Sequence, residues 1–213
     1  GSAVNLSVAH EHAAAVLQGW YPGEQGGLAV ADVLFGATSP SGRLPVTFYR
    51  SVEDLPPFED YGMAGRTYRY FRGEPRYPFG FGLDYADVHY DELALSSESI
   101  KEGGEVTLSV RATNADGSPV RSVTQLTVEY GDAPFAAPLR ELRGIRVAHL
   151  EPGQSKTLSF ALSSADLSLV NEAGERVFVP GGVRLHVGAT QPDARSLALG
   201  ATAPLSADLQ LVS

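Results

Sequence analysis

The second half of the chain alternates apolar and polar residues, and this period of two constrains the fold more than any other feature. From about Asp87 onward the alternation recurs in short runs, at Val106-Leu108-Val110, Val123/Leu126/Val128, Ile145-Val147, Leu158-Phe160-Leu162, Val177-Val179 and Val183-Leu185-Val187. Turn sequences separate the runs, at 102–104, 116–119, 151–153 and 180–182. Short alternating strands at such spacing predict an antiparallel, immunoglobulin-like β-sandwich.

The first fifty residues follow a different pattern, which predicts an α/β segment. An Ala-rich stretch predicts a short helix over 10–17, ended by Trp20-Tyr21-Pro22-Gly23. Leu28, Ala31 and Phe35 lie at helical spacing and predict a second helix over 26–35, with Gly36 as its stop. Residues 44–48 are predicted to form a strand.

Residues 51–86 are rich in both Pro and Gly, which exclude long regular elements, and in aromatic residues. The rings belong to Tyr61, Tyr68, Tyr70, Phe71, Tyr77, Phe79, Phe81 and Tyr85. Disordered linkers carry few aromatic residues, so we predict an ordered connector whose rings are buried against neighbouring domains. Tyr61, Tyr68 and Tyr70 could instead stack on sugar rings, but packing is favoured.

The composition excludes several classes of function. A net charge of −9 over 213 residues argues against a nucleic-acid partner. The absence of Cys excludes disulfides and thiolate metal sites, and no apolar run is long enough for a membrane span. His10 and His12 are two residues apart and do not match the spacing of a zinc helix, so no metal is expected.

Several stretches of the sequence form a set of motifs in a fixed order. Residues 19–27 (GWYPGEQGG) and 31–36 (ADVLFG) resemble the hallmark of glycoside hydrolase family 3, and residues 39–48 (SPSGRLPVTF) look like the end of its α/β sandwich. Residues 65–71 (GRTYRYF) and 77–83 (YPFGFGL) look like its connector. Residues 139–144 (LRELRG) and 150–156 (LEPGQSK) resemble its fibronectin-III-like domain.

The resemblance implies three parts within this chain. Residues 1–50 would be the C-terminal part of an α/β-sandwich domain, 51–86 the connector, and 87–213 a fibronectin-III-like β-sandwich. The family also has a (β/α)8-type barrel and further sandwich strands upstream. We expect these as partners of the chain, either in the same precursor or in a companion chain.

The resemblance also implies a retaining, exo-acting β-glucosidase or β-xylosidase, with the two sugars left open. Retaining glycosidases use two carboxyl groups about 5 Å apart. In this family the nucleophile is an Asp on the barrel and the acid/base is a Glu in a sandwich loop, and no residue here matches either motif. The chain alone is therefore expected to carry no catalytic residue, to be inactive and to need no cofactor.

A β-linked oligosaccharide is the implied substrate, and a secreted or periplasmic location is favoured over a cytoplasmic one. The alternative is a non-catalytic carbohydrate- or protein-binding or scaffolding module.

Three residues remain as candidates for contact with a substrate, namely Glu24, Tyr61 and Tyr68. Glu24 lies in a Gly-rich turn and could line a site. The simpler explanation is that a negative charge is favourable near the N-terminus of the helix that follows. Arg66 and Arg69 are candidates for carboxylate pairing across the domain interface.

Overall fold

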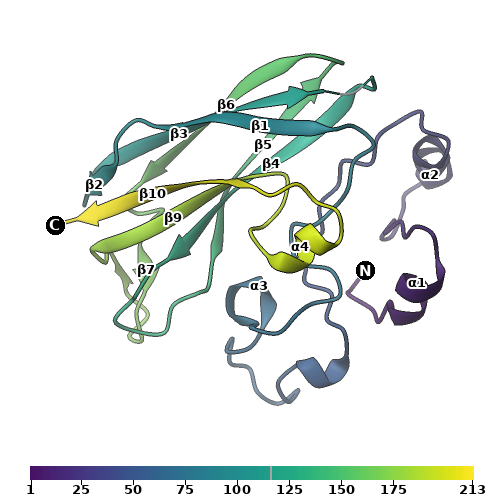
Figure 1. Cartoon of the computed structure of the whole chain (residues 1–213). Helices are drawn as coiled ribbons and strands as arrows, with labels where there is room; N and C mark the ends of the chain where they lie inside the picture. Colours follow the sequence, from purple (N-terminus) through teal and green to yellow (C-terminus); the bar gives the residue numbers. More distant parts are fainter. Residues whose placement is uncertain (116) are drawn as a thin grey trace.

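The computed structural model describes residues 1–115 and 117–213, and its second half is a sandwich of two β-sheets (Figure 1). One sheet has the strand order β1-β3-β6, from Val88–Leu95, Glu105–Asn114 and Ser155–Ser163. The other has the order β2-β10-β9-β4-β5, from Ser99–Lys101, Leu205–Val212, Gly181–Gly188, Val120–Tyr130 and Glu141–Leu150. A short hairpin joins β7 (Leu169–Val170) to β8 (Arg176–Val177). The predicted sandwich is confirmed, and all pairings are antiparallel except that of β10 with β2.

The core lies between the two sheets and is built by the alternating positions. On β3, Val106, Leu108 and Val110 are fully buried, while the residues between them point away from the core. Leu108 lies opposite Phe160 of β6, and the facing sheet contributes Leu126, Val128, Leu185 and Val187. Period-two patterning therefore fixes which face of each strand is buried.

On β4, two of the inward positions are polar, which explains the irregular alternation of this strand. Ser122 and Thr124 are fully buried between the apolar residues Val120 and Leu126. Their hydroxyls lie 3.2 and 3.0 Å from the hydroxyl of Tyr90 on β1, so the two sheets are also joined by hydrogen bonds. The alternation in the sequence shifts between Val123 and Leu126, and in the structure Val123 lies on the opposite face of the strand from Leu126 and Val128.

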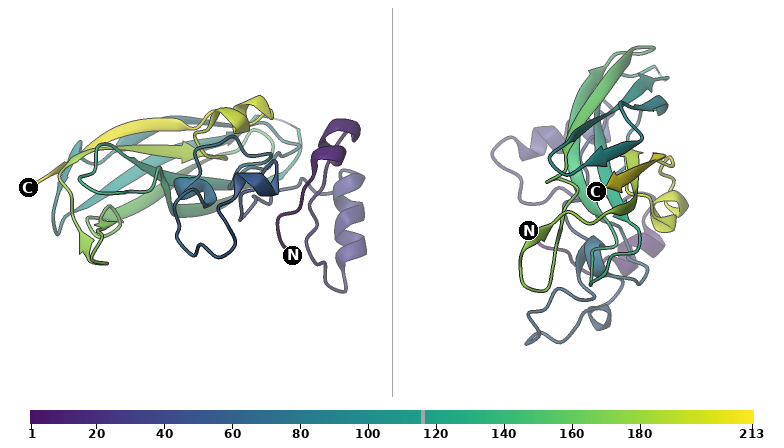
Figure 2. Two further views of the ribbon diagram at one scale, coloured as in Figure 1. Left: turned by 90° about the horizontal axis from the view of Figure 1, so that it is seen from below. Right: turned by 90° about the vertical axis from the view of Figure 1, so that its left-hand side faces the viewer.

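The α/β segment and the connector lie at one end of the sandwich and beside it (Figures 1 and 2). Helix α2 (Gly26–Leu34) confirms the second predicted helix. The connector contains only a 3₁₀ turn, η1 (Val52–Asp54), and one helical turn, α3 (Thr67–Tyr70). A further short helix, α4 (Ala194–Ala198), precedes β10 and was not predicted.

Two local predictions in the α/β segment are wrong. Helix α1 spans Ser7–His12 rather than 10–17, because Ala13 is already extended and residues 13–17 are exposed. A short helix depends on packing more than on Ala content. Residues 44–48 form no continuous strand, although they lie beside residues 76–81. Leu44 exchanges backbone hydrogen bonds with Gly80 and Phe81, and Phe48 forms an isolated bridge with Tyr77. Pro45 and Pro78 lack an N–H and interrupt the ladder between these two points.

Asp116, within the predicted turn at 116–119, lies outside the described residues. No helix among residues 1–115 and 117–213 is long and apolar enough to cross a lipid bilayer.

His186 on β9 makes the stability of the sandwich depend on pH. Burial lowers the pKa of His186, against the opposing effect of Glu129, whose carboxylate lies 3.0 Å from Nε2. The folded state therefore favours the neutral ring. Its contribution is complete above the unfolded pKa of about 6.5 and is lost as the pH falls through the lower, folded pKa.

We predict that the His186→Gln variant loses less stability than the wild type between pH 7.5 and pH 5, roughly the range in which imidazole titrates. Urea unfolding at several pH values, followed by circular dichroism, measures the difference. Equal pH dependence in the two proteins would show that His186 is not the titrating group.

Candidate functional site

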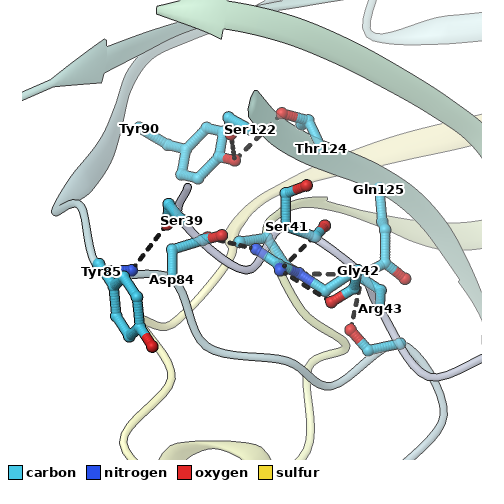
Figure 3. A network of polar contacts seen from close by, with 12 residues as sticks. Ser39, Ser41, Gly42, Arg43, Asp84, Tyr85, Tyr90, Ser122, Thr124 and Gln125 are labelled. Atoms are coloured by element: carbon cyan, nitrogen blue, oxygen red, sulfur yellow. Dashed lines mark hydrogen bonds and ion pairs between the residues drawn. The ribbon is translucent and has the colours of Figure 1, made fainter. Parts of the chain in front are cut away.

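A buried ion pair joins the α/β segment to the connector and to the sandwich (Figure 3). Arg43 lies in an irregular segment after α2, and its Nη2 donates to Oδ2 of Asp84 in the connector over 2.6 Å. The two side chains are only 6% and 9% exposed. Nε of Arg43 donates to the Ala189 carbonyl, just after β9, over 2.9 Å. One guanidinium thus binds three segments that are far apart in the sequence.

Two glutamines of the sandwich extend this network. The side-chain amide of Gln125 on β4 donates to the carbonyls of Gly80 and Ala189, each over 2.9 Å. Gln191 donates to Oγ1 of Thr127 over 2.9 Å and to Oε1 of Gln125 over 3.3 Å. All three of these side chains are buried. The face of β4 that points away from the core is therefore covered by polar contacts to the connector and to the segment that follows β9.

Aromatic rings fill the space between the α/β segment and the connector. Phe48 is almost fully buried and contacts both Trp20 and Tyr77, with ring centroids 6.1 and 6.4 Å apart. Tyr77 also stacks on Phe81 at 6.0 Å. The predicted packing of the connector rings is confirmed here, but not for Tyr61 or Tyr85, which are 88% and 51% exposed in the described chain.

A second charged cluster links α3 to β5. Nη1 of Arg69 lies 3.2 Å from Oε1 of Glu141, and Oε2 of Glu141 is bound by Arg143. Arg143 also donates to the Tyr130 hydroxyl over 2.8 Å. Burial, opposed by Arg143, raises the pKa of Tyr130 to about 12, so this phenol stays neutral. The expected carboxylate pairing across the interface is found for Arg69. Arg66 instead donates to three backbone carbonyls of its own loop.

The three residues singled out from the sequence lie in different places. Glu24 is exposed in the turn before α2. Tyr61 is exposed in the connector loop, whereas Tyr68 of α3 stacks on Phe79 with ring centroids 4.1 Å apart. The Tyr68 hydroxyl also accepts a 3.0 Å hydrogen bond from the backbone N–H of Leu142 on β5. Tyr68 therefore packs between the connector and the sandwich, and Tyr61 keeps its ring free of such packing.

His10, near the N-terminus, contacts two other side chains. Nδ1 of His10 lies 3.0 Å from the Tyr77 hydroxyl, and Nε2 lies 3.3 Å from Nη2 of Arg195 in α4. In the part of the chain that the structure describes, no group of three or more His, Cys, Asp or Glu residues is placed to bind a metal ion. His10 thus ties α1 to the connector and to the sandwich.

Arg43, Asp84, Gln125 and Gln191 were not predicted as site residues from the sequence. On β4, Gln125 and Thr127 alternate with Leu126 and Val128, which is the usual pattern of a strand with one buried and one solvated face. The pattern therefore gives no sign that the second face of this strand is covered.

Comparison with known proteins assigns both halves of this architecture. Residues 1–85 match the family model of the glycosyl hydrolase family 3 C-terminal domain, and residues 122–191 match that of the fibronectin type III-like domain. An α/β segment joined to such a sandwich defines the C-terminal architecture of a class of glycoside hydrolases. The chain belongs to glycoside hydrolase family 3.

Relatives with assigned names support the same family. The periplasmic β-glucosidase of Salmonella typhimurium is 35% identical over 190 residues, which is 84% of this chain and 25% of the relative. The xylan 1,4-β-xylosidase of Xylanibacter ruminicola is 38% identical over 167 residues, covering 78% of this chain and 19% of the relative. The chain thus spans about a quarter or less of the length of these two relatives.

A solved structure shows a similar fold over nearly the whole chain. The β-glucosidase of Listeria innocua in complex with gluconolactone superposes with a TM-score of 0.81 at 25% identity. The match covers 99% of this chain and 29% of that protein.

The stability of the fold should depend on the buried ion pair between Arg43 and Asp84. Replacing Arg43 with Met should destabilise the fold by about 3–5 kcal/mol, because Asp84 is left buried without its counter-charge. The double variant Arg43→Met/Asp84→Leu should recover much of that loss, since it removes both charges together. Urea denaturation of the wild type and both variants measures the difference. A double variant no more stable than the single one would show that the hydrogen bond to Ala189, rather than the ion pair, dominates.

Gly80 accepts a hydrogen bond from Gln125 and has a left-handed backbone conformation. Its φ is +78°, and an added Cβ would lie 2.5 Å from Oε1 of Gln125. Gly103 has the same φ of +78° with open space around it, so it is a matched control. We expect Gly103→Ala to cost about 1–2 kcal/mol of backbone strain alone, and Gly80→Ala to cost measurably more. Equal losses in urea unfolding would mean that the Gln125 amide moves aside freely.

Proposed function

We propose that this chain is the C-terminal, structural part of a retaining, exo-acting β-glycosidase, either a β-glucosidase or a β-xylosidase. The observation that carries the proposal is the match of two family models in order, over an α/β segment and a sandwich that a buried network joins. Relatives named for both activities match the chain at comparable identity, so both sugars remain candidates.

In this proposal the nucleophile and the acid/base lie outside the chain, on residues upstream of the segment described here. The role of the chain is to complete the domain that presents the acid/base and to fix its orientation. The proposed division is residues 1–50 as sandwich-domain end, 51–86 as connector and 87–213 as fibronectin-III-like domain. The start of β1 at Val88 supports the last boundary.

The exposed apolar residues of α2 support the proposal that this face packs against another part of the protein. This helix has no buried residue, and Leu28, Leu34 and the following Phe35 are strongly exposed. An apolar hollow of about 420 Å³ adjoins it, lined in part by Leu17, Val30 and Val33. Exposed apolar patches of this kind usually mark contacts with other parts of a protein. We propose that the upstream barrel and sandwich strands cover this face, in the same precursor or in a companion chain.

The proposed substrate is a β-linked oligosaccharide, and the proposed location is secreted or periplasmic. The name of the Salmonella relative, a periplasmic β-glucosidase, supports that location. A non-catalytic binding or scaffolding role is the second candidate, and the exposed aromatic rings of the connector favour it.

The test is an activity assay of the native protein that contains this sequence. We expect it to hydrolyse a chromogenic β-glucoside or β-xyloside, and we expect the 22.6 kDa chain alone to be inactive. An intact mass measured on the same material shows whether further residues accompany the chain. A native protein of 22.6 kDa, with no companion polypeptide and no hydrolysis, would count against the proposal and favour the second candidate.

A further inference from the structure

The connector carries a loop, residues 57–65, whose two aromatic rings project into solvent. Phe58 and Tyr61 are each 88% exposed. Their exposure contrasts with that of Tyr68, Tyr77 and Phe81 in the same connector, which pack on other rings. The loop therefore displays two large side chains that the rest of the described chain does not cover.

Arg66 holds this loop in one shape from within. Its Nε donates to the Gly62 carbonyl over 3.1 Å, and its Nη2 donates to the carbonyls of Pro57 and Asp60 over 3.1 and 2.6 Å. The backbone N–H of Asp60 donates to Pro57, closing a turn, and Oδ1 of Asp60 accepts from the N–H of Gly62. Because the guanidinium occupies the inside of the loop, the side chains at 58 and 61 are left on the outside.

The base of the loop is also fixed. The Tyr49 hydroxyl accepts a 2.7 Å hydrogen bond from the backbone N–H of Thr67. Thr67 has a φ of +56°, which is an unfavourable conformation for a β-branched residue. Strain of this kind persists only where the surroundings enforce it, and it gathers at functional sites. The loop is thus organised before any ligand binds, which lowers the entropy cost of binding.

The exposed groups suit a saccharide better than a protein. A pyranose presents an apolar face of C–H groups that can lie on an aromatic ring, and its hydroxyls can donate to the exposed carboxylates of Glu59 and Asp60. Two fully covered rings bury about 300–500 Å², whereas a stable protein interface needs about 800 Å² from each partner. The surface is therefore large enough for one or two sugar units and small for a protein partner.

We propose that loop 57–65 is a carbohydrate-binding platform, in which Phe58 and Tyr61 stack on the sugar units of a β-linked gluco- or xylo-oligosaccharide. Glu59 and Asp60 accept hydrogen bonds from the sugar hydroxyls, and Arg66 is the positioning residue that holds the loop. The choice of sugar rests on the proposed function.

The test is titration of the full 213-residue chain with cellopentaose and with xylopentaose, followed by NMR or calorimetry. We expect saturable binding with a Kd of about 1 mM or below. Tyr61→Ala and Phe58→Ala should each weaken it about tenfold or more. Arg66→Lys should also weaken it with both rings in place, because an ammonium group cannot serve three carbonyls in the fork geometry of a guanidinium. Tyr21→Ala and Phe35→Ala, at rings that are 85% and 89% exposed elsewhere, should leave Kd unchanged.

Each result has a distinct meaning. Thermal unfolding of every variant shows whether a loss of binding reflects a loss of fold. An absence of binding by the folded wild type up to about 10 mM, or equal losses in the two control variants, overturns the inference. Self-association that Tyr61→Ala abolishes, without saccharide binding, would also overturn it and assign the loop to a protein contact. Binding is measured without hydrolysis, so a failure to detect glycosidase activity counts against the proposed function and not against saccharide binding by the loop. Hydrolysis by the native protein without binding at the loop overturns the loop inference and leaves the proposed function intact.

Discussion

The ion pair between Arg43 and Asp84 is the contact on which the arrangement of the chain depends. Burying two charges is costly, and it is favourable only where geometry and additional hydrogen bonds compensate for the lost water. Here the same guanidinium also donates to the carbonyl of Ala189, so the compensation requires three separate segments to be in place at once. The α/β segment cannot shift along the sandwich without leaving a buried charge unpaired. This coupling explains how a connector with almost no secondary structure can be an ordered part of the molecule.

The interface and the core of the sandwich are held together by different kinds of contact. The sheets are held by apolar packing around Leu108, Phe160 and Leu185, which is tolerant of small shifts because it has little directionality. The connector is held by the hydrogen bond from Gln125 to the Gly80 carbonyl, and Gln191 holds the Gln125 amide in place. Hydrogen bonds of this kind specify distance and angle. The sandwich core thus contributes packing without strong directionality, and the interface contributes a defined orientation.

The sequence predicted the sandwich well because alternation is a local signal that survives in each strand. It predicted α2 for the same reason, since Leu28, Ala31 and Phe35 repeat at helical spacing. It failed for residues 44–48, where Pro45 and Pro78 interrupt the pairing of this segment with residues 76–81. It also missed the Arg43 network, because its members come from four distant segments and no single segment shows the partner. Of the candidate substrate contacts, the sequence selected Tyr61 and Tyr68 equally, and only the structure distinguished a packed ring from an exposed one.

The interface also has a consequence for how such chains diverge. Several of its side-chain donors end on backbone carbonyls: Arg43 on Ala189, Gln125 on Gly80 and Ala189, and Arg195 on Arg76. A carbonyl is present whatever residue occupies the position, so Ala189 and Arg76 can change identity during evolution without loss of the bond. Gly80 is the exception, because its positive φ and its close approach to Gln125 require a glycine. The donors have no such freedom, because each needs its own nitrogen geometry. Homologous interfaces can therefore drift far apart in sequence on the accepting side while they keep the same relative orientation of their domains.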